Sequence, residues 1–150
     1  MSDADLAALA RLHEACFPDD AWDSAALTTI LAMPGTEGRI ACSDAREITG
    51  VLITQCLGED AEILTLGVLP TQRRRGIAKA LLTDFVARAR ALGSVQIMLE
   101  VAADNAAALA LYRAFGFEHQ GTRRNYYRRA AGTAMDAWRL RLAIAKPNGG

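Results

Sequence analysis

Three consecutive arginines stand directly before a glycine that opens a helical pattern. Arg73, Arg74 and Arg75 precede Gly76, and apolar side chains recur at helical spacing from there to Leu92. The first N–H groups of a helix have no partner inside the helix, and the helix dipole places partial positive charge at the same end. The pattern therefore predicts a site for a diphosphate group. On the pattern alone, a solvated basic loop is the alternative interpretation.

Short motifs narrow the class of ligand. Gly76 would let the backbone approach an anion closely, and Ala78 keeps a neighbouring position small. The sequence has no G-x-x-x-x-G-K-[ST] motif, and the segment from Gly76 to Ala78 lacks the preceding glycine and the following acidic residue of a dinucleotide fingerprint. These absences indicate a phosphate-bearing ligand other than a simple nucleotide.

Farther along the chain, Glu100 and Tyr112 carry groups that could move protons. Glu100 stands in an otherwise apolar run, where a buried carboxylate is costly unless it has a partner or a task. A general base, a solvent-facing glutamate and an ion pair with an arginine all fit that pattern. Tyr112 could act as a general acid, although the pattern alone favours a core aromatic. Asn105 stands seven residues before Tyr112, which would place both on one face of the helix. Asn105 could bind a ligand there, or it could cap the helix.

Composition limits the class of protein. The 150 residues, 51% of them hydrophobic, suit one domain over 1–150, with 146–150 expected to fray. Seventeen basic and 17 acidic side chains cancel, so no overall field recruits nucleic acid or a membrane surface. Cys16, Cys42 and Cys56 lack metal or redox spacing, and we expect buried, reduced thiols and no metal. Without a signal peptide or a long apolar run, a cytoplasmic protein is expected.

The elements that position these residues follow an α/β order. We expect helices at 3–16, 23–33, 76–92 and 105–115, and strands at 36–42, 47–57, 61–68, 95–101, 117–124 and 135–144. The expected caps are Asp3, then Asp23 or Ser24, then Asp104 or Asn105. An early hairpin and one strand–helix–strand crossover predict a mixed, mostly antiparallel twisted sheet flanked by helices.

The motifs of this sequence resemble those of the GNAT acetyltransferases. Arg73-x-x-Gly76-x-Ala78 matches their [QR]-x-x-G-x-[GA] loop, and residues 66–70 match the strand before it. Residues 99–117 resemble the L-E-V-x-x-x-N-x-x-A-x-x-L-Y-x-x-x-G-F block of the ribosomal-protein-alanine N-acetyltransferases (RimI-type), and 123–127 resemble their R-x-N-Y-Y segment. Phe17-Pro18 with Trp22 resembles an early F-P-W. The resemblance covers roughly residues 6 to 142.

This resemblance implies a role for each candidate residue. Acetyl-CoA would be bound by Leu66, Val68, Arg73, Arg74, Arg75, Gly76, Ile77, Ala78 and Asn105, with backbone N–H groups near Val68 holding the thioester carbonyl. Glu100 would be the general base, directly or through water, and Tyr112 the general acid. Asn125, Tyr126 and Tyr127 would shape the acceptor pocket from a loop after a strand. The transfer would be direct, because none of the cysteines lies in a motif.

The resemblance also sets the expected acceptor. It implies an N-α-acetyltransferase acting on a protein N-terminus, an alanine-initiated ribosomal protein; the alternatives are a GNAT enzyme for small amines and a non-catalytic acyl-CoA-binding module. The sequence departs from the family twice. The usual first strand is missing or very short, and Ala102-Ala103-Asp104 replaces the more typical R-A-S. The basic and aromatic stretch from Arg123 to Arg129 is expected at the acceptor site rather than on RNA. His13 and His119 lack ligand-spaced partners, so we expect surface or packing roles.

Overall fold

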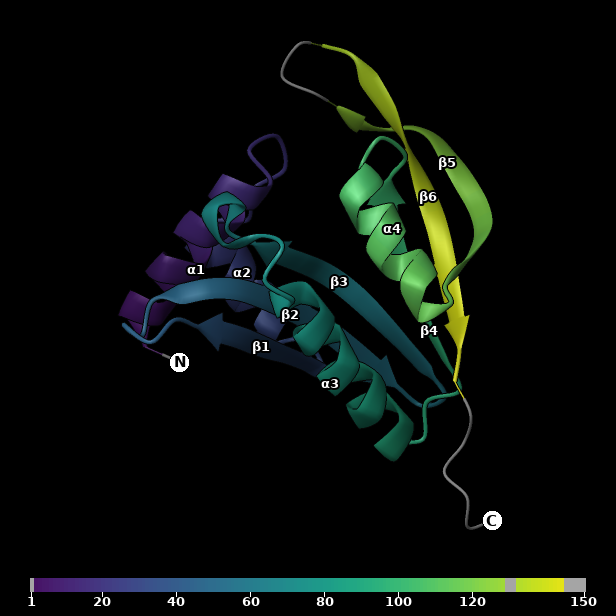
Figure 1. The fold of residues 1–150 in the computed structure, drawn as a ribbon, viewed down its shortest axis with the longest axis horizontal. Helices are drawn as coiled ribbons and strands as arrows, with labels where there is room; N and C mark the ends of the chain where they lie inside the picture. Colours follow the sequence, from purple (N-terminus) through teal and green to yellow (C-terminus); the bar gives the residue numbers. More distant parts are fainter. Residues whose placement is uncertain (1, 129–131, 145–150) are drawn as a thin grey trace. The chain divides into compact units, whose positions relative to one another are not determined.

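A mixed sheet with helices forms the described part of the chain. The computed structural model describes residues 2–128 and 132–144 (Figure 1). The elements are α1 (Asp3–Cys16), α2 (Ser24–Leu31), β1 (Thr36–Cys42), β2 (Ile48–Leu57), β3 (Asp60–Val68), η1 (Pro70–Gln72), α3 (Ile77–Ala91), β4 (Gln96–Ala102), α4 (Ala106–Phe115), β5 (Glu118–Arg128) and β6 (Ala134–Ala143). Six strands follow the order β1-β2-β3-β4-β6-β5, with β3 and β4 parallel. The mixed, mostly antiparallel sheet is thereby confirmed, and no strand precedes α1 in the described chain.

The helix starts follow local capping chemistry, with one correction to the expected caps. Ser2, not Asp3, is the N-cap of α1, because its hydroxyl accepts from the Asp5 N–H at 3.2 Å while the Asp5 carboxylate accepts from the Ser2 N–H. Asp3 is already helical. Asp23 caps α2 by accepting from the Ala26 N–H at 2.8 Å. At both of these helices, a side chain satisfies one of the first free N–H groups.

The chain forms two compact parts, the first from the described residues of 1–55 and 64–87, the second from those of 56–63 and 88–150. In the first part, β2 is buried on both faces. A core cluster joins the first two helices to one face of β2: Leu9, Leu12, Leu27, Val51 and Ile53. On the other face Leu52 is fully buried. This explains why β2 reads as a continuous apolar run rather than an alternating one.

Gly50 fixes where α3 begins. A Cβ at Gly50 would lie 2.9 Å from Cγ2 of Ile77, the first residue of α3, and 3.4 Å from the carbonyl oxygen of Gly67. A larger residue at 50 would therefore displace the start of this helix. The close contact holds the first turn of α3 against β2, and with it the loop that precedes the helix.

The second part is built on β4 and β6. Leu99 pairs with Leu140 and Glu100 with Arg139, and β5 continues the antiparallel ladder on the far side of β6. A Cβ at Gly116, which ends α4, would lie 3.5 Å from Cδ1 of Leu142. Leu142 shares a face with Leu99, so α4 covers the face that carries Leu99 (Figure 1). Because strand residues alternate between faces, Glu100 lies on the opposite one.

The cysteines depart from the expected burial at one position. None of the three forms a disulfide, and Cys42 is exposed whereas Cys16 and Cys56 are half-buried. Cys42 ends β1, an edge strand of the sheet whose alternate residues face solvent. No helix among the described residues is long and apolar enough to cross a membrane. The expected frayed end, 146–150, lies outside the described residues.

Candidate active site

The loop before α3 has the backbone conformation that a close-approaching anion needs. Gly76 has a φ of 79°, in the left-handed region, and a Cβ there would meet no described atom within 4 Å. Its carbonyl accepts the first helical hydrogen bond, from the Ala80 N–H at 2.9 Å. Arg74 also has a positive φ, of 66°. Backbone at Gly76 is therefore open on the side where a side chain would otherwise stand.

The N-terminus of α3 lies at Ile77, directly after Gly76. The first turn of this helix contains no acidic residue. Its first N–H groups combine with the helix dipole to favour an anion. The exposed side chains of Arg74 and Arg75 add positive charge beside this end. The residues present thus fit a diphosphate group.

Arg73 has a different role from its two neighbours. Its Nε donates to the carbonyl oxygen of Val68 at 3.2 Å, and its guanidinium interacts with the Cys16 thiol. Burial raises the pKa of that thiol although Arg73 acts in the opposite direction. A Cβ at Gly67 would lie 3.1 Å from the Cys16 sulfur, so α1 and β3 meet closely here. Arg73 therefore ties the loop before α3 to the end of β3 through its bond to the Val68 carbonyl.

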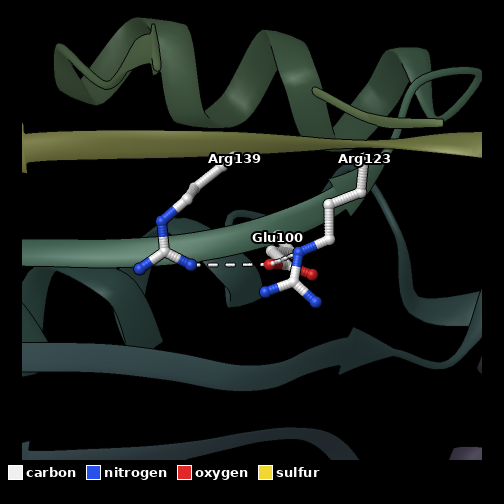
Figure 2. A network of polar contacts seen from close by, with 3 residues as sticks. All are labelled: Glu100, Arg123 and Arg139. Carbon is white, nitrogen blue, oxygen red and sulfur yellow. Dashed lines mark hydrogen bonds and ion pairs between the residues drawn. The ribbon is translucent and has the colours of Figure 1, made fainter. Parts of the chain in front are cut away.

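In the second part, two arginines converge on Glu100 (Figure 2). Nε of Arg123 lies 2.9 Å from Oε1 of Glu100, and Nη1 of Arg139 lies 3.4 Å from the same oxygen. The Glu100 side chain is 16% exposed. A partly buried carboxylate requires such partners. The ion pair, one of the alternatives that the sequence left open, is present in the structure.

Tyr112 is buried in α4 and keeps its proton. Its ring packs edge-on against Phe117, with centroids 5.3 Å apart. Burial, and to a lesser extent the nearby phenol of Tyr127, raises the pKa of Tyr112 well above its ordinary value. Tyr112 is therefore protonated at neutral pH, and the same burial makes its phenol a weaker acid than an exposed tyrosine. The structure thus brings Tyr112 near Tyr127, one of the three residues expected at the acceptor pocket.

Asn105 has the structural role that the sequence left open. Its side chain accepts from the Ala108 N–H at 3.2 Å and caps α4. We expected Asn105 to lie on the same helical face as Tyr112. The structure instead places residue 105 just before the first helical residue of α4. The cap gives Asn105 a use that needs no ligand.

Residues 125–127 lie within β5, not in a loop after it, which corrects the expected end of the strand at 124. The pairing with β6 is irregular between Arg123 and Tyr127, where Asn125 has a φ of 54° and donates its N–H to Oδ1 of Asp136 at 2.9 Å. Tyr126 is 51% exposed and meets Tyr127 edge-on. The Arg123 guanidinium lies 5.3 Å from the Tyr126 ring centre. A bulge in a strand therefore presents these side chains.

Sequence reasoning missed the role of Arg139 and the depth of His13. Arg139 belongs to none of the sequence motifs. Its contact with Glu100 follows only from the pairing of β4 with β6, which sets the two residues opposite each other. His13 packs, as expected, but it is 3% exposed, and its Nε2 lies 3.0 Å from the Thr65 hydroxyl. Its ring stacks on Trp22, with centroids 4.7 Å apart. The exposed His119 contacts Trp138.

Comparison with known proteins identifies the class. The model of the acetyltransferase (GNAT) family matches residues 6–117. The chain therefore belongs to the GNAT family, and it is an N-acetyltransferase.

Individual relatives agree with this assignment. The chain is 37% identical over 134 residues to the N-alpha-acetyltransferase RimI of Mycobacterium tuberculosis, covering 87% of this chain and 80% of that protein. It is 41% identical over 80 residues to the ribosomal protein bS18-alanine N-acetyltransferase of Salmonella typhimurium. That match covers 53% of this chain and 54% of the relative, about half of each.

Solved structures share the fold. The ribosomal-protein-S18-alanine N-acetyltransferase of Escherichia coli has a TM-score of 0.86 at 26% identity, covering 100% of this chain and 96% of that one. Arabidopsis thaliana NAA60, solved with acetyl-CoA, has a TM-score of 0.83 at 24% identity over 96% of each chain, a likeness of fold alone.

Proposed function

We propose that this chain transfers acetyl from acetyl-CoA to the N-terminal amine of a protein, and that its acceptor is an alanine-initiated ribosomal protein. The loop before α3 carries the proposal, because Gly76 is left-handed and open at a helix start without an acidic residue. The names of the relatives, which include alanine N-acetyltransferases of ribosomal protein bS18, support the choice of acceptor.

The donor would be bound mainly by backbone groups. The N–H groups at Gly76, Ile77 and Ala78 would hold the diphosphate of acetyl-CoA, with Arg74 and Arg75 adding charge. Leu66 and Val68 would border the pantetheine chain, and backbone N–H groups near Val68 would stabilise the oxyanion. Arg73 would keep the loop in place through its bond to the Val68 carbonyl.

Two side chains would move the protons. Glu100 accepts a proton from the acceptor ammonium, directly or through water, and the free amine attacks the thioester carbon. The C–N bond forms, the C–S bond breaks, and Tyr112 gives its proton to the departing thiolate. The second proton, which the attacking nitrogen loses as it becomes an amide, reprotonates the Tyr112 phenolate. Glu100 and α4, which carries Tyr112, lie on opposite faces of the sheet in the second part. The amine would approach the thioester carbon from one side and the thiolate would leave on another. A base and an acid on different faces suit such a reaction.

The acceptor would be held by the irregular segment of β5. Asn125, Tyr126 and Tyr127 form an aromatic and amide surface beside Arg123. Tyr127 also influences the phenol of Tyr112. This relation supports placing the acceptor's first residue near the acid. Asn105, whose oxygen already caps α4, is the weakest member of the proposed set.

A panel of amines tests the acceptor. Purified protein with acetyl-CoA would be offered an alanine-initiated peptide from a ribosomal protein, the same peptide with a blocked N-terminus but a free lysine, a polyamine and an amino acid. We expect acetylation at the free α-amine alone, located by mass spectrometry. Activity confined to the small amines would contradict the peptide acceptor and establish the rival small-molecule function.

Kinetics test the direct route and the catalytic character. Varying both substrates should give intersecting double-reciprocal lines, as a ternary complex requires; parallel lines would indicate an acyl-enzyme. Glu100→Gln and Tyr112→Phe should each lower turnover while leaving acetyl-CoA binding intact. A wild-type protein that binds acetyl-CoA but acetylates no amine, with the same binding in both variants, would instead favour a non-catalytic binding module.

A further inference from the structure

The two arginines at Glu100 contact the same carboxylate oxygen. Arg123 reaches Oε1 at 2.9 Å and Arg139 reaches Oε1 at 3.4 Å (Figure 2). A carboxylate held by one oxygen keeps a lone-pair set on the other for an incoming proton donor. The contact therefore fixes the side chain without occupying all of its basic positions.

The backbone dictates the contact with Arg139. Glu100 of β4 and Arg139 of β6 are direct partners in the antiparallel ladder, so their side chains leave the sheet on one face. On the other side of Arg139 stands Gly121 of β5. A Cβ at Gly121 would have no described atom within 4 Å. With no side chain at 121, the ladder offers Arg139 an acidic partner on β4 and none on β5.

The contact with Arg123 connects Glu100 to the proposed acceptor surface. Arg123 of β5 reaches Glu100 with its Nε while its guanidinium carbon lies 5.3 Å from the Tyr126 ring centre. Its side chain is 57% exposed, so water weakens the ion pair. Arg139 makes the longer contact, but its side chain is only 39% exposed and it stands directly opposite Glu100 in the ladder.

We propose that Arg139, assisted by Arg123, is a positioning residue that holds Glu100 through Oε1 and presents Oε2 to the acceptor amine. This inference rests on the proposed function, since it assumes that Glu100 is the base. The arginines take no part in the chemistry themselves. They remove rotational freedom from the carboxylate, which would otherwise have to be ordered in each reaction cycle.

The test compares turnover in four variants on an amine that the wild-type protein acetylates. Arg139→Gln should lower kcat by about 10- to 100-fold, the loss expected from a misplaced catalytic group, with the KM for acetyl-CoA unchanged. Arg139→Lys should restore most of the activity, because Oε1 needs one cationic donor from this position. Gly121→Glu should also lower kcat, because it places a second carboxylate opposite Arg139. Gly121→Gln, its uncharged match, should not.

A double-mutant cycle and a matched arginine isolate the route of the effect. In the Glu100→Gln background, Arg139→Gln should cause no further loss, because its effect passes through the carboxylate. Arg141→Gln is the control: Arg141 lies on the same face of β6 and bonds to Gln96 at 2.5 Å instead. It should keep wild-type kcat, and melting temperatures should show that every variant folds.

The outcomes separate this inference from the function on which it rests. Wild-type kcat in Arg139→Gln, or a full additional loss in the Glu100→Gln background, would overturn the positioning role while leaving Glu100 as the base. Undiminished turnover in Glu100→Gln would overturn the role of Glu100 as the base and, with it, the positioning role, while the acetyl transfer itself would stand. A wild-type protein that acetylates no peptide would overturn the proposed function instead.

Discussion

Nε2 of His13 lies 3.0 Å from the hydroxyl of Thr65, and the two residues stand 52 positions apart in the sequence. The other ring nitrogen accepts the backbone N–H of Trp22 at 3.0 Å. Nδ1 must be unprotonated to accept, so the neutral ring with its proton on Nε2 satisfies both contacts. Burial accordingly lowers the pKa of His13 to about 4.

The first prediction is a loss of stability in mild acid. The unfolded chain binds a proton at His13 below pH ~6.5, whereas the folded chain does so only near pH 4, so stability falls as pH drops through that interval. The loss should be of the order of 1–3 kcal/mol. Urea unfolding of wild type and His13→Asn at several pH values would measure it.

The variants differ in pH dependence as well as in stability. His13→Asn should be less stable at pH 7 and show a flatter profile between pH ~6.5 and 4. His119→Asn, at an exposed histidine, serves as control and should keep the wild-type slope. If His13→Asn kept that slope too, other groups would account for the acid sensitivity.

The second prediction concerns Gly76. Gly76→Val should destabilise the fold by about 1–2 kcal/mol, the cost of a side chain in the left-handed region, and should raise the KM for acetyl-CoA at least ~10-fold. Gly58, with a φ of 60° and no described atom near a Cβ, provides a matched control. Gly58→Val should lose similar stability but keep its KM. If both variants changed the KM for acetyl-CoA equally, the change would come from general destabilisation rather than from loss of a contact at Gly76.

The third prediction concerns Tyr112. Tyr112→Phe keeps the ring that packs on Phe117 and removes the hydroxyl. We expect kcat to fall by roughly 10²-fold or more, as for loss of a general acid, with little change in melting temperature. Calorimetric titration with CoA should give an unchanged affinity. A wild-type kcat would mean that solvent protonates the thiolate.

The fourth prediction separates the backbone of Asn125 from its side chain. Asn125→Gly keeps the left-handed backbone and the N–H bond to Asp136, so the melting temperature should be maintained. If the amide contacts the acceptor, the KM for the peptide should rise while the KM for acetyl-CoA stays constant. An unaffected peptide KM would assign Asn125 to the bulge alone.

Local patterns predicted the helices, most strand positions and the loop that precedes α3. The core of β2 and the helix after Gly76 follow from hydrophobic spacing, and Asn105 was among the expected caps. The cap of the first helix is Ser2 rather than the expected Asp3. Ser2 and Asp5 form a reciprocal capping box, which is missed when each residue is considered alone. Such errors are small because capping is local.

Contacts between distant segments could not be predicted. Arg139 lies 39 residues from Glu100, and nothing in its neighbourhood distinguishes it from Arg141. Asn125 favours a turn by its own preferences, but pairing with β6 carries the strand beyond it to Arg128. His13 lies on an ordinary amphipathic helix, and its partner Thr65 becomes visible only when the strands are assembled.

The ladder position of Glu100 also bears on how the strands find their alignment during folding. A slip of β6 by one residue would set Leu140 or Trp138 opposite Glu100 in place of Arg139. Either slip would leave a carboxylate facing an apolar side chain and turn Leu140 out of the core. The charge pair thus penalises misaligned sheets, and a neutral pair at these positions would leave the alignment to hydrophobic matching alone.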